Sequence, residues 1–455
     1  MKKVTYIFSL SLLFVFGSCK KFLEVQPQLQ VDQAEAITNA GTAATAANGL
    51  FNLLAANGYY GSNFPALSYL SAGDIQWSGS QGDPSEITKH LTSATNGYVQ
   101  SAWTAIYRTI AQANYIIDKV PGVTDPLLTT AVKNQYLGEA YFVRALGYFD
   151  LARGWGGVQL ILKPTNASTD NSGIPRSSLA DTYAQVLKDL NLAEILVPTG
   201  VNRNRVTLRT VQALKARFYL YQKNWVLAEQ FASTVIGDNT NFSLVTPYSA
   251  FFANNVATTN ESVLELAYTT SNTNGHSNWW LPPALGGRRE WSPNDALVAK
   301  LNSATIGGNR NALIAQTAPP GNLWYGKLYY RNPLGTDPAY VIRVSELFLI
   351  RSEARAYQGN LVGLNSAQSD LNAVRTRAGV GATTATTLPD FLTALENERQ
   401  VEFPFEADRW FNLVRTERAQ AALALPDKHL YLFPIPYNET LVDPQLGGAN
   451  RNPGY

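Results

Sequence analysis

The chain has 455 residues, a formal net charge of +2, and 15% charged side chains, where an average soluble protein has about 25%. It contains no long run of lysine or arginine, so neither nucleic acid nor an anionic membrane surface is favoured as a partner, because both require a basic stripe. With 11% aromatic residues and few charges, the surface is expected to consist largely of uncharged polar and aromatic groups, which suit neutral, hydroxyl-rich ligands.

Residues 1–18 have the pattern of a lipoprotein signal peptide that ends at the only cysteine. Lys2 and Lys3 precede an apolar run at 4–16, which is shorter than the roughly 20 residues of a membrane-spanning helix, and two small residues follow. The pattern predicts cleavage before Cys19 and lipidation of Cys19 with more than one chain, which gives stable membrane anchoring. A plain signal peptide with a free thiol is disfavoured, because exposed free thiols are rare in oxidising compartments.

The positions of glycine and proline, together with the spacing of apolar residues, predict the helices and loops that follow. Residues 19–32 are expected to form a lipid-anchored tether, and residues 33–455 a single domain that begins with an Ala-rich helix at 33–56. Glycines and prolines interrupt any long element at 57–98, so a long structured loop region is expected there. Apolar residues at a 3.6-residue period predict the following helices, at 102–120, 127–153, 181–196, 210–222 and 226–236.

Two stretches have the spacing of a tetratricopeptide unit, in which small residues let two helices approach closely. The first has its turn at Asn224-Trp225 and its packing positions at Ala216, Tyr219, Ala228, Ala232 and Val235. The second has its turn at Gly359-Asn360 and its packing positions at Ala354, Tyr357, Ala367, Leu371 and Val374. The prediction is an all-α, tetratricopeptide-like scaffold with helix pairs within 102–236 and 341–378. Because an array needs three or more units, degenerate pairs are expected among the helices before residue 196.

Residues 238–337 interrupt this scaffold with a second irregular segment. They show no sustained period, and a structureless stretch of that length is usually either functional or disordered. Four tryptophans occur among its Gly, Pro and Asn residues, which argues against disorder. We therefore expect the irregular segments to form the ligand face of the domain.

Several sequence stretches occur together and in a fixed order. Besides the lipidation motif at Cys19, they are EAYFVRALGYFDLARGWGGV at 139–158, RVSELFLIRSEA at 343–354, DLNAVR at 370–375, ERQVEF at 398–403, RWFNLVR at 409–415, FPIP at 433–436 and NPGY at 452–455. This combination resembles the SusD/RagB family, the starch-binding-protein-like lipoproteins that serve nutrient uptake on the outer membrane of Bacteroidetes. Two small departures are the phenylalanine that begins the lipidation motif and Gln400, where the family often has an arginine.

The resemblance implies several properties of the protein. It implies a single α-helical domain of tetratricopeptide pairs whose irregular face binds glycans, anchored by lipid at the cell surface. It also implies a partner in the outer membrane, a TonB-dependent, SusC-like transporter that the domain covers during polysaccharide utilisation. The family signatures mark scaffold positions, so the identity of the ligand does not follow from them. No cofactor is implied.

Three carboxylates, Glu398, Glu402 and Glu406, are spaced four residues apart and are predicted to share one helix face. Glycoside hydrolysis needs two carboxylates across a cleft, about 5 Å or about 6.5–9.5 Å apart, and one of them with a raised pKa. The nearby arginines would instead lower the pKa values of these carboxylates, so ion pairing is favoured over catalysis and no enzyme activity is predicted; these arginines are Arg399, Arg409 and Arg415. Pro404 is expected to kink or end the helix.

No metal site or catalytic motif is predicted from the remaining polar residues. The three histidines, His90, His276 and His429, are scattered and lack carboxylates at ligand spacing, so hydrogen-bonded or solvated roles are favoured. Asp83 and Glu86, like Asp74, are loop carboxylates for which sugar hydrogen bonding or solvation is favoured over acid–base work or calcium binding.

The nine tryptophans divide into two groups. Those within helical patterns are expected to pack in the core: Trp103, Trp155, Trp225 and Trp410. For those in irregular segments, ligand contact and loop packing remain equally open: Trp77, Trp279, Trp280, Trp291 and Trp324. An indole stacks on the C–H face of a sugar ring, while Asp and Arg side chains bind hydroxyl pairs. The candidate ligand contacts are therefore these five tryptophans with Asp74 and Arg288, from the segments 57–98 and 270–330.

Four functions remain open at this point. The favoured one is non-enzymatic capture of oligosaccharides for a transporter. The alternatives are a tetratricopeptide scaffold that binds protein through its groove, or capture of another nutrient such as peptide. An enzyme is the least favoured.

Overall fold

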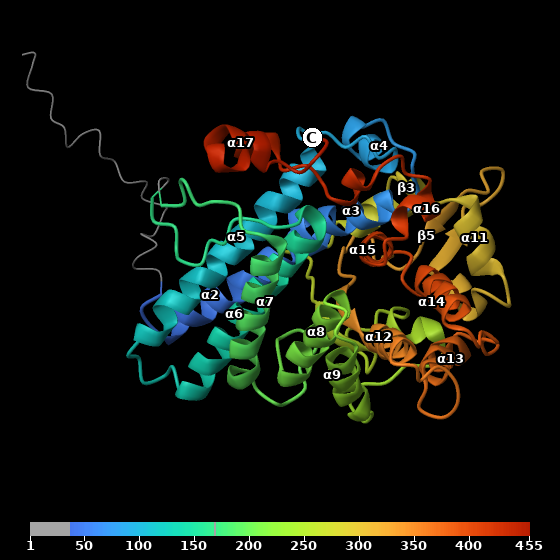
Figure 1. The fold of residues 1–455 in the computed structure, drawn as a ribbon, viewed down its shortest axis with the longest axis horizontal. Coiled ribbons are helices and arrows are strands. Elements are labelled where there is room, and N and C mark those ends of the chain that lie inside the picture. Colours follow the sequence, from blue (N-terminus) through green and yellow to red (C-terminus); the bar gives the residue numbers. More distant parts are fainter. Residues whose placement is uncertain (1–36, 168–169) are drawn as a thin grey trace, which may run out of the picture.

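The computed structural model of the chain describes residues 37–167 and 170–455 (Figure 1). The predicted signal peptide, Cys19 and the tether at 19–32 lie outside the described residues. Within the described residues helices predominate, and the named strands form three two-stranded antiparallel sheets. The predicted all-α class is confirmed.

Long helices of the N-terminal half pack against one another, at the left of Figure 1. They are α2 (Ala40–Leu54), α5 (Gly97–Lys119), α6 (Thr130–Trp155) and α7 (Leu179–Leu196). Polar side chains cap their first turns, because a helix leaves its first N–H groups without backbone partners: Asn96 caps α5, Thr129 caps α6 and Ser178 caps α7. Helix α6 is buried along residues 138–155 and forms the centre of this layer.

The two tetratricopeptide-like pairs occur where the sequence predicts them. They are α8 (Leu208–Tyr221) with α9 (Trp225–Gly237), and α12 (Val344–Tyr357) with α13 (Ala367–Arg377). Ala216 and Ala228 are fully buried on touching helices. Helix α9 also packs on α12, where the ring of Trp225 stacks on that of Tyr357, with centroids 4.2 Å apart and planes 8° from parallel. The prediction of two packed helix pairs is confirmed.

The region 57–98 is more regular than its glycines and prolines suggest. It contains a π-helical turn and two α-helices: η4 (Asn57–Gly61), α3 (Asn63–Ser71) and α4 (Gly82–Thr88). Pro65 lies in the first turn of α3, where a missing N–H breaks no helical hydrogen bond. Helix α3 is buried on all sides, so its sequence has no polar face and no helical period. A long structured loop region was expected there, and the structure has short helices and a strand instead.

The region 238–337 consists of short elements, as its lack of period predicts. The strands here and just beyond are β2 (Ser262–Leu266), β3 (Trp291–Pro293), β4 (Ile314–Gln316), β5 (Trp324–Gly326) and β6 (Ala339–Arg343). The helical pieces are η6 (Tyr248–Phe251), α10 (His276–Trp280), η7 (Pro283–Leu285), α11 (Asp295–Asn302) and η8 (Gly308–Leu313). Strand β2 pairs with β6, and β4 pairs with β5.

The C-terminal part returns to helices. They are α14 (Leu388–Glu402), α15 (Arg409–Arg415), α16 (Ala419–Leu423) and α17 (Tyr437–Val442), and 3-10 turns occur at η9 (Lys428–Tyr431), η10 (Pro444–Leu446) and η11 (Gly448–Asn450). A further 3-10 turn, η5 (Val120–Gly122), follows α5 in the N-terminal half. Helix α14 ends at Glu402, so the break predicted from Pro404 is confirmed. No helix within the described residues has the length and apolar character needed to cross a membrane.

A buried network of arginines and glutamates joins these parts. Arg310 pairs with Glu398 and Glu402, and all three side chains are at most 1% exposed. Arg343 and Arg377 both bind Glu261 and Glu402. We refer to these six residues together with Glu406, which forms two hydrogen bonds with Arg343 (2.9 and 2.7 Å), as the arginine network. The ion-pairing role predicted for the three carboxylates is thus seen in the structure.

The partners within this network differ from those expected. Arg399, Arg409 and Arg415 bind Asp408, Asp74 and Glu353 instead. Burial acts to raise the pKa of Glu402, but the charges of Arg377, Arg310 and Arg343 outweigh it and hold that pKa below its usual value. Burial raises the pKa of Glu406 to about 6, so the lowering predicted for that group is wrong.

The network leads to a prediction for Glu402→Gln. Removing this carboxylate leaves buried arginine charges uncompensated, which should cost about 3–5 kcal/mol in the free energy of unfolding at pH 7. Because the pKa of Glu402 is lower in the folded than in the unfolded state, this contribution should be complete above about pH 4.5 and decline as the pH falls below it. Urea unfolding at pH 7 and pH 3.5 measures both effects.

The matched control is Glu396→Gln, one and a half turns earlier on α14. Glu396 pairs with the half-exposed Arg418 at 3.0 Å, and surface pairs contribute about 0–1 kcal/mol. Equal losses in the two variants would contradict a dominant role for the network.

The helix pair α8–α9 leads to a second prediction. Ala228→Leu should lower the free energy of unfolding by about 1–3 kcal/mol, because the added methyl groups overpack a fully buried contact. Val226→Leu is the control, since Val226 lies on the same helix and is 62% exposed. Chemical denaturation compares the two variants, and a neutral Ala228→Leu would show that the pair is not closely packed.

Candidate ligand-binding site

The two irregular segments that were expected to form the ligand face meet in the fold. Strand β1 (Ile75–Trp77) pairs with β3 antiparallel, and Trp77 lies opposite Trp291 in that register. Hydrogen bonds continue beyond the strands, because the Ser78 N–H donates to the carbonyl of Glu290 at 2.9 Å. The predicted juxtaposition of the two segments is therefore seen in the structure.

Four of the loop tryptophans, Trp77, Trp279, Trp280 and Trp291, are joined by ring contacts at this junction. The ring of Trp279 stacks on that of Trp291, with centroids 5.3 Å apart and planes 24° from parallel. The ring of Trp77 lies 6.2 Å from that of Trp279, inclined by 49°. Trp291 is fully buried, whereas Trp77 and Trp279 are half-buried. The partly exposed Trp279 thus rests on the buried Trp291, and the partly exposed Trp77 lies beside Trp279.

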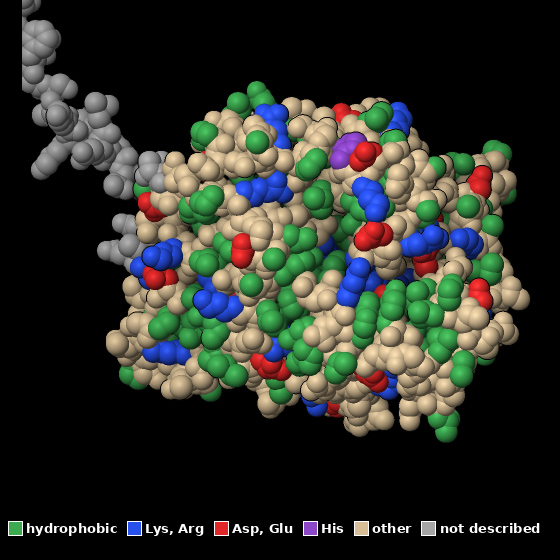
Figure 2. All heavy atoms as spheres, in the orientation of Figure 1, with side chains coloured by type: hydrophobic (Ala, Val, Ile, Leu, Met, Phe, Trp, Pro, Cys, Tyr) green, Lys and Arg blue, Asp and Glu red, His purple; other side chains and the backbone are tan. Residues whose placement is uncertain are grey.

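Charged groups lie beside these indoles. The guanidinium of Arg288 lies 5.0 Å from the ring centroid of Trp279, in cation–π contact, and its Nε donates to Glu290 Oε1 at 2.9 Å. We call Trp77, Trp279, Arg288 and Glu290 the aromatic patch. The face of the molecule in Figure 2 has its charged side chains scattered among apolar and uncharged polar ones, with no basic stripe.

The aromatic patch keeps unused hydrogen-bonding capacity. Trp77 Nε1, a donor, and Glu290 Oε2, an acceptor, are shielded from solvent and have no hydrogen-bond partner among the described residues. Both side chains adjoin Gly79, where an added Cβ would come within 2.3 Å of the Trp77 ring and 2.8 Å of Glu290 Cδ. Glycine is therefore required for this close approach of the loop, and the two unpaired atoms are a local cost in stability.

Trp324 lies near this junction but outside the ring cluster. It is half-buried on β5, which packs beside β3, and its carbonyl accepts a 2.8 Å hydrogen bond from Arg289 Nε. No ring contact joins Trp324 to another tryptophan within the described residues.

Three of the expected ligand contacts, Asp74, Trp280 and Trp291, are buried, which does not fit direct contact with a ligand. Asp74 accepts from Gln400 Nε2 at 2.7 Å and pairs with Arg409 at 2.7 Å, while burial raises the pKa of Asp74. Trp280 is 1% exposed and its ring packs against those of Tyr69 and Phe405. Trp291 forms the base of the cluster, and Trp280 packs against Trp291 beneath it.

The remaining polar residues singled out in the sequence have structural partners. Asp83 accepts from the Gly97 N–H at the start of α5, and Glu86 accepts from Ser93 and Asn96. His276 is fully buried between the hydroxyl of Tyr69 and the carbonyl of Tyr60, and burial lowers its pKa to about 4. Within residues 37–167 and 170–455, no group of three or more His, Cys, Asp or Glu side chains is placed to hold a metal ion.

Three of the four tryptophans expected in the core are buried there, and the fourth is only partly buried. Trp103, Trp155 and Trp410 are at most 2% exposed. Trp225 is only half-buried and stacks on Tyr357 at the contact between the two helix pairs. The sequence also gave no indication of Glu290, because its role depends on the distant residues Trp77 and Gly79.

Comparisons with known proteins agree with this fold. A family model described as "Starch-binding associating with outer membrane" matches residues 21–220, and the model of the SusD family matches residues 324–430. A SusD-like protein of Bacteroides ovatus is 26% identical over 77% of this chain and 70% of its own length. The SusD-like protein P38 of Formosa agariphila is 31% identical over 53% of this chain and 46% of its own length.

Solved structures share the fold at low sequence identity. A SusD superfamily protein from Bacteroides vulgatus superposes with a TM-score of 0.81 at 20% identity, covering 91% of this chain and 99% of the other. A laminarin-binding SusD-like protein has a TM-score of 0.78 at 22% identity, covering 92% of this chain and all of the other. The chain belongs to the SusD/RagB family.

Proposed function

We propose that the protein is a cell-surface lipoprotein that captures oligosaccharides and delivers them to a TonB-dependent, SusC-like transporter in the outer membrane. Family membership supports carbohydrate binding as the broad role, and a structural neighbour is named for binding laminarin. The observation that carries the proposal is the aromatic patch, in which two partly exposed indoles lie beside the exposed guanidinium of Arg288.

The chemistry of the patch suits a neutral sugar. The rings of Trp77 and Trp279 offer flat apolar surface to the C–H faces of pyranose rings. Arg288, whose side chain is 44% exposed, offers N–H donors to ligand hydroxyls at the edge of the patch. The support from Trp291 fixes the rings before a ligand arrives, which reduces the entropy lost on binding.

A binding protein accounts for the carboxylates better than an enzyme does. Glu398, Glu402 and Glu406 are committed to arginines inside the protein, away from any ligand. At the patch, Glu290 is the only carboxylate whose atom lacks a partner within the described residues, and glycoside hydrolysis generally uses a pair. We therefore infer capture without turnover.

A second candidate is binding of protein or peptide by the tetratricopeptide-like pairs. Its support is the stack of Trp225 on Tyr357, since Tyr357 is 41% exposed at the contact between the pairs. A peptide held there would use an aromatic surface separate from the aromatic patch.

The two candidates predict opposite effects of matched substitutions. Trp77→Ala and Trp279→Ala should each weaken binding of the oligosaccharide identified on a glycan array by about 1–3 kcal/mol, or roughly tenfold or more, with little change in thermal stability. Trp225→Ala, which removes an indole of similar exposure, should leave glycan affinity unchanged. Titration calorimetry and thermal melts measure both quantities.

Trp280→Ala serves as a second control, because it removes a buried ring and should lower stability by about 3–5 kcal/mol. The proposal is refuted if the two patch variants bind glycan as well as the wild type. Loss of binding only in Trp225→Ala would move the site to the helix pairs. New reducing ends in the wild-type sample would indicate an enzyme.

Lipid attachment at Cys19 is the part of the proposal that concerns localisation. Mass spectrometry of membrane-extracted protein should show an acylated amino-terminal cysteine, because the motif ends at the only cysteine of the chain. Cys19→Ala should move the protein from the outer-membrane fraction to the soluble fraction. Retention of that variant in the membrane would contradict the proposed anchor.

A further inference from the structure

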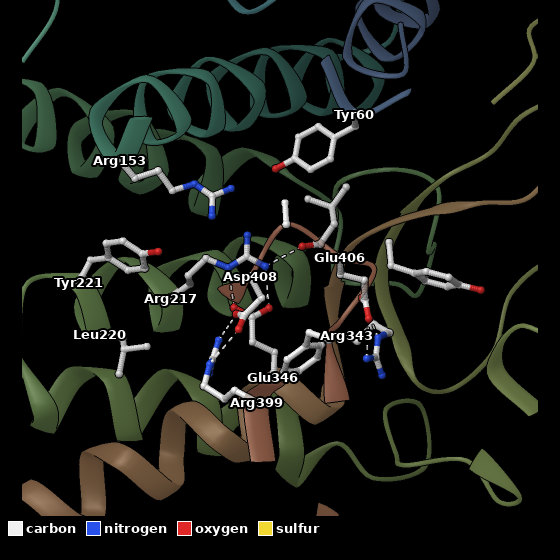
Figure 3. A pocket seen from close by; sticks show the side chains of 14 residues that line it. Tyr60, Arg153, Arg217, Leu220, Tyr221, Arg343, Glu346, Arg399, Glu406 and Asp408 are labelled. Carbon is white, nitrogen blue, oxygen red and sulfur yellow. Dashed lines mark hydrogen bonds and ion pairs between the residues drawn. The ribbon is translucent and has the colours of Figure 1, made fainter. Parts of the chain in front are cut away.

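A small cavity lies where the N-terminal helices meet the segment after α14. Its volume is about 40 Å³, and side chains from η4, α6, α8, α14 and the following segment line it (Figure 3). Four arginines contribute to the lining: Arg153, Arg217, Arg343 and Arg399. The polar ends of Arg153, Arg217 and the two tyrosines Tyr60 and Tyr221 point toward one shared space in Figure 3.

The carboxylates around this cavity are already engaged. Asp150 pairs with Arg153 at 2.7 Å and also accepts hydrogen bonds from the hydroxyls of Tyr59 and Tyr60. Glu346 receives two hydrogen bonds of 2.6 Å from Arg217. Asp408 accepts two hydrogen bonds from Arg399, and Glu406 accepts two from Arg343.

The unused polar atoms at the cavity are donors. Arg153 Nη1, Arg217 Nη1 and the Tyr221 hydroxyl have no hydrogen-bond partner within residues 37–167 and 170–455, and Arg399 Nη1 is buried without one. Burial and the charge of Arg153 both act to lower the pKa of Arg217, although Glu346 outweighs them. Leaving the buried N–H of Arg399 Nη1 without an acceptor costs free energy, and so does the proximity of the Arg153 and Arg217 cations.

We propose that this cavity binds one small inorganic anion of chloride size between the guanidinium groups of Arg153 and Arg217. An anion has only acceptor sites, which complements a lining whose free groups are donors. The volume of about 40 Å³ admits a monatomic ion or about three waters but excludes a sugar or a peptide side chain. This site is separate from the aromatic patch, and the inference does not depend on the proposed function.

Bound there, the anion would join parts of the chain that are distant in sequence. Arg153 is on α6, Arg217 is on α8, and Arg399 and Asp408 flank the segment that contains Phe405. The Phe405 ring packs on Trp280 at 4.7 Å, just beneath the cluster of the aromatic patch. The expected consequence is a folded state that is stabilised by chloride through mass action.

Thermal unfolding of the full mature protein tests the proposal. Chloride is titrated at constant ionic strength against gluconate, an anion too large for the cavity. The wild type should show a saturable rise in Tm with chloride. Tyr221→Phe, which removes a hydroxyl without an internal partner, should still fold and should need roughly tenfold more chloride for the same rise.

The matched control is Tyr219→Phe on the same helix. The Tyr219 hydroxyl also has no hydrogen-bond partner among the described residues, and the Tyr219 ring stacks on Phe231, outside the cavity. Its chloride response should equal that of the wild type. Crystals grown in bromide should give an anomalous peak between Arg153 and Arg217. The same Tm in chloride and gluconate, an unchanged response in Tyr221→Phe, or no bromide in the cavity would each overturn the proposal in favour of water.

Discussion

The arginine network is the constraint on which the rest of the structure depends. Arg310, Arg343 and Arg377 come from η8, β6 and α13, and they converge on Glu261 of the β2 edge and on the end of α14. Because these charges are buried, removing the partner of any one of them would lower the free energy of unfolding by about 3–5 kcal/mol. The network therefore fixes where α14 ends and where the chain goes next.

This constraint reaches the aromatic patch through packing. The segment after α14 places Phe405 against Trp280, and Trp280 meets Trp291 edge to face at 5.6 Å. Trp291 in turn supports Trp279 at the surface. A chain of contacts thus runs from buried ion pairs through buried aromatic rings to the partly exposed indoles, and each layer restricts the next.

The spacing of apolar residues along the chain predicts most of the long helices. The burial of individual side chains depends on contacts with residues far away in the sequence, so the sequence does not predict it. Helix α5 has a polar and an apolar face, whereas α3 has no polar face and so no visible period. Neighbours such as Trp279 and Trp280 point in different directions on α10, and composition does not indicate which one is buried. Asp74 was expected at the surface because its partners, Gln400 and Arg409, are over 300 residues away.

The geometry of the two surface indoles restricts the shape of any chain that contacts both. Their planes are inclined by 49° and their centroids are 6.2 Å apart, and the close approach at Gly79 holds the Trp77 ring in place. A straight, flat ribbon can lie against one of these planes, whereas a chain that turns between neighbouring units can lie against both. For a polymer held at the patch, the curvature of its backbone would matter as much as the identity of its sugars.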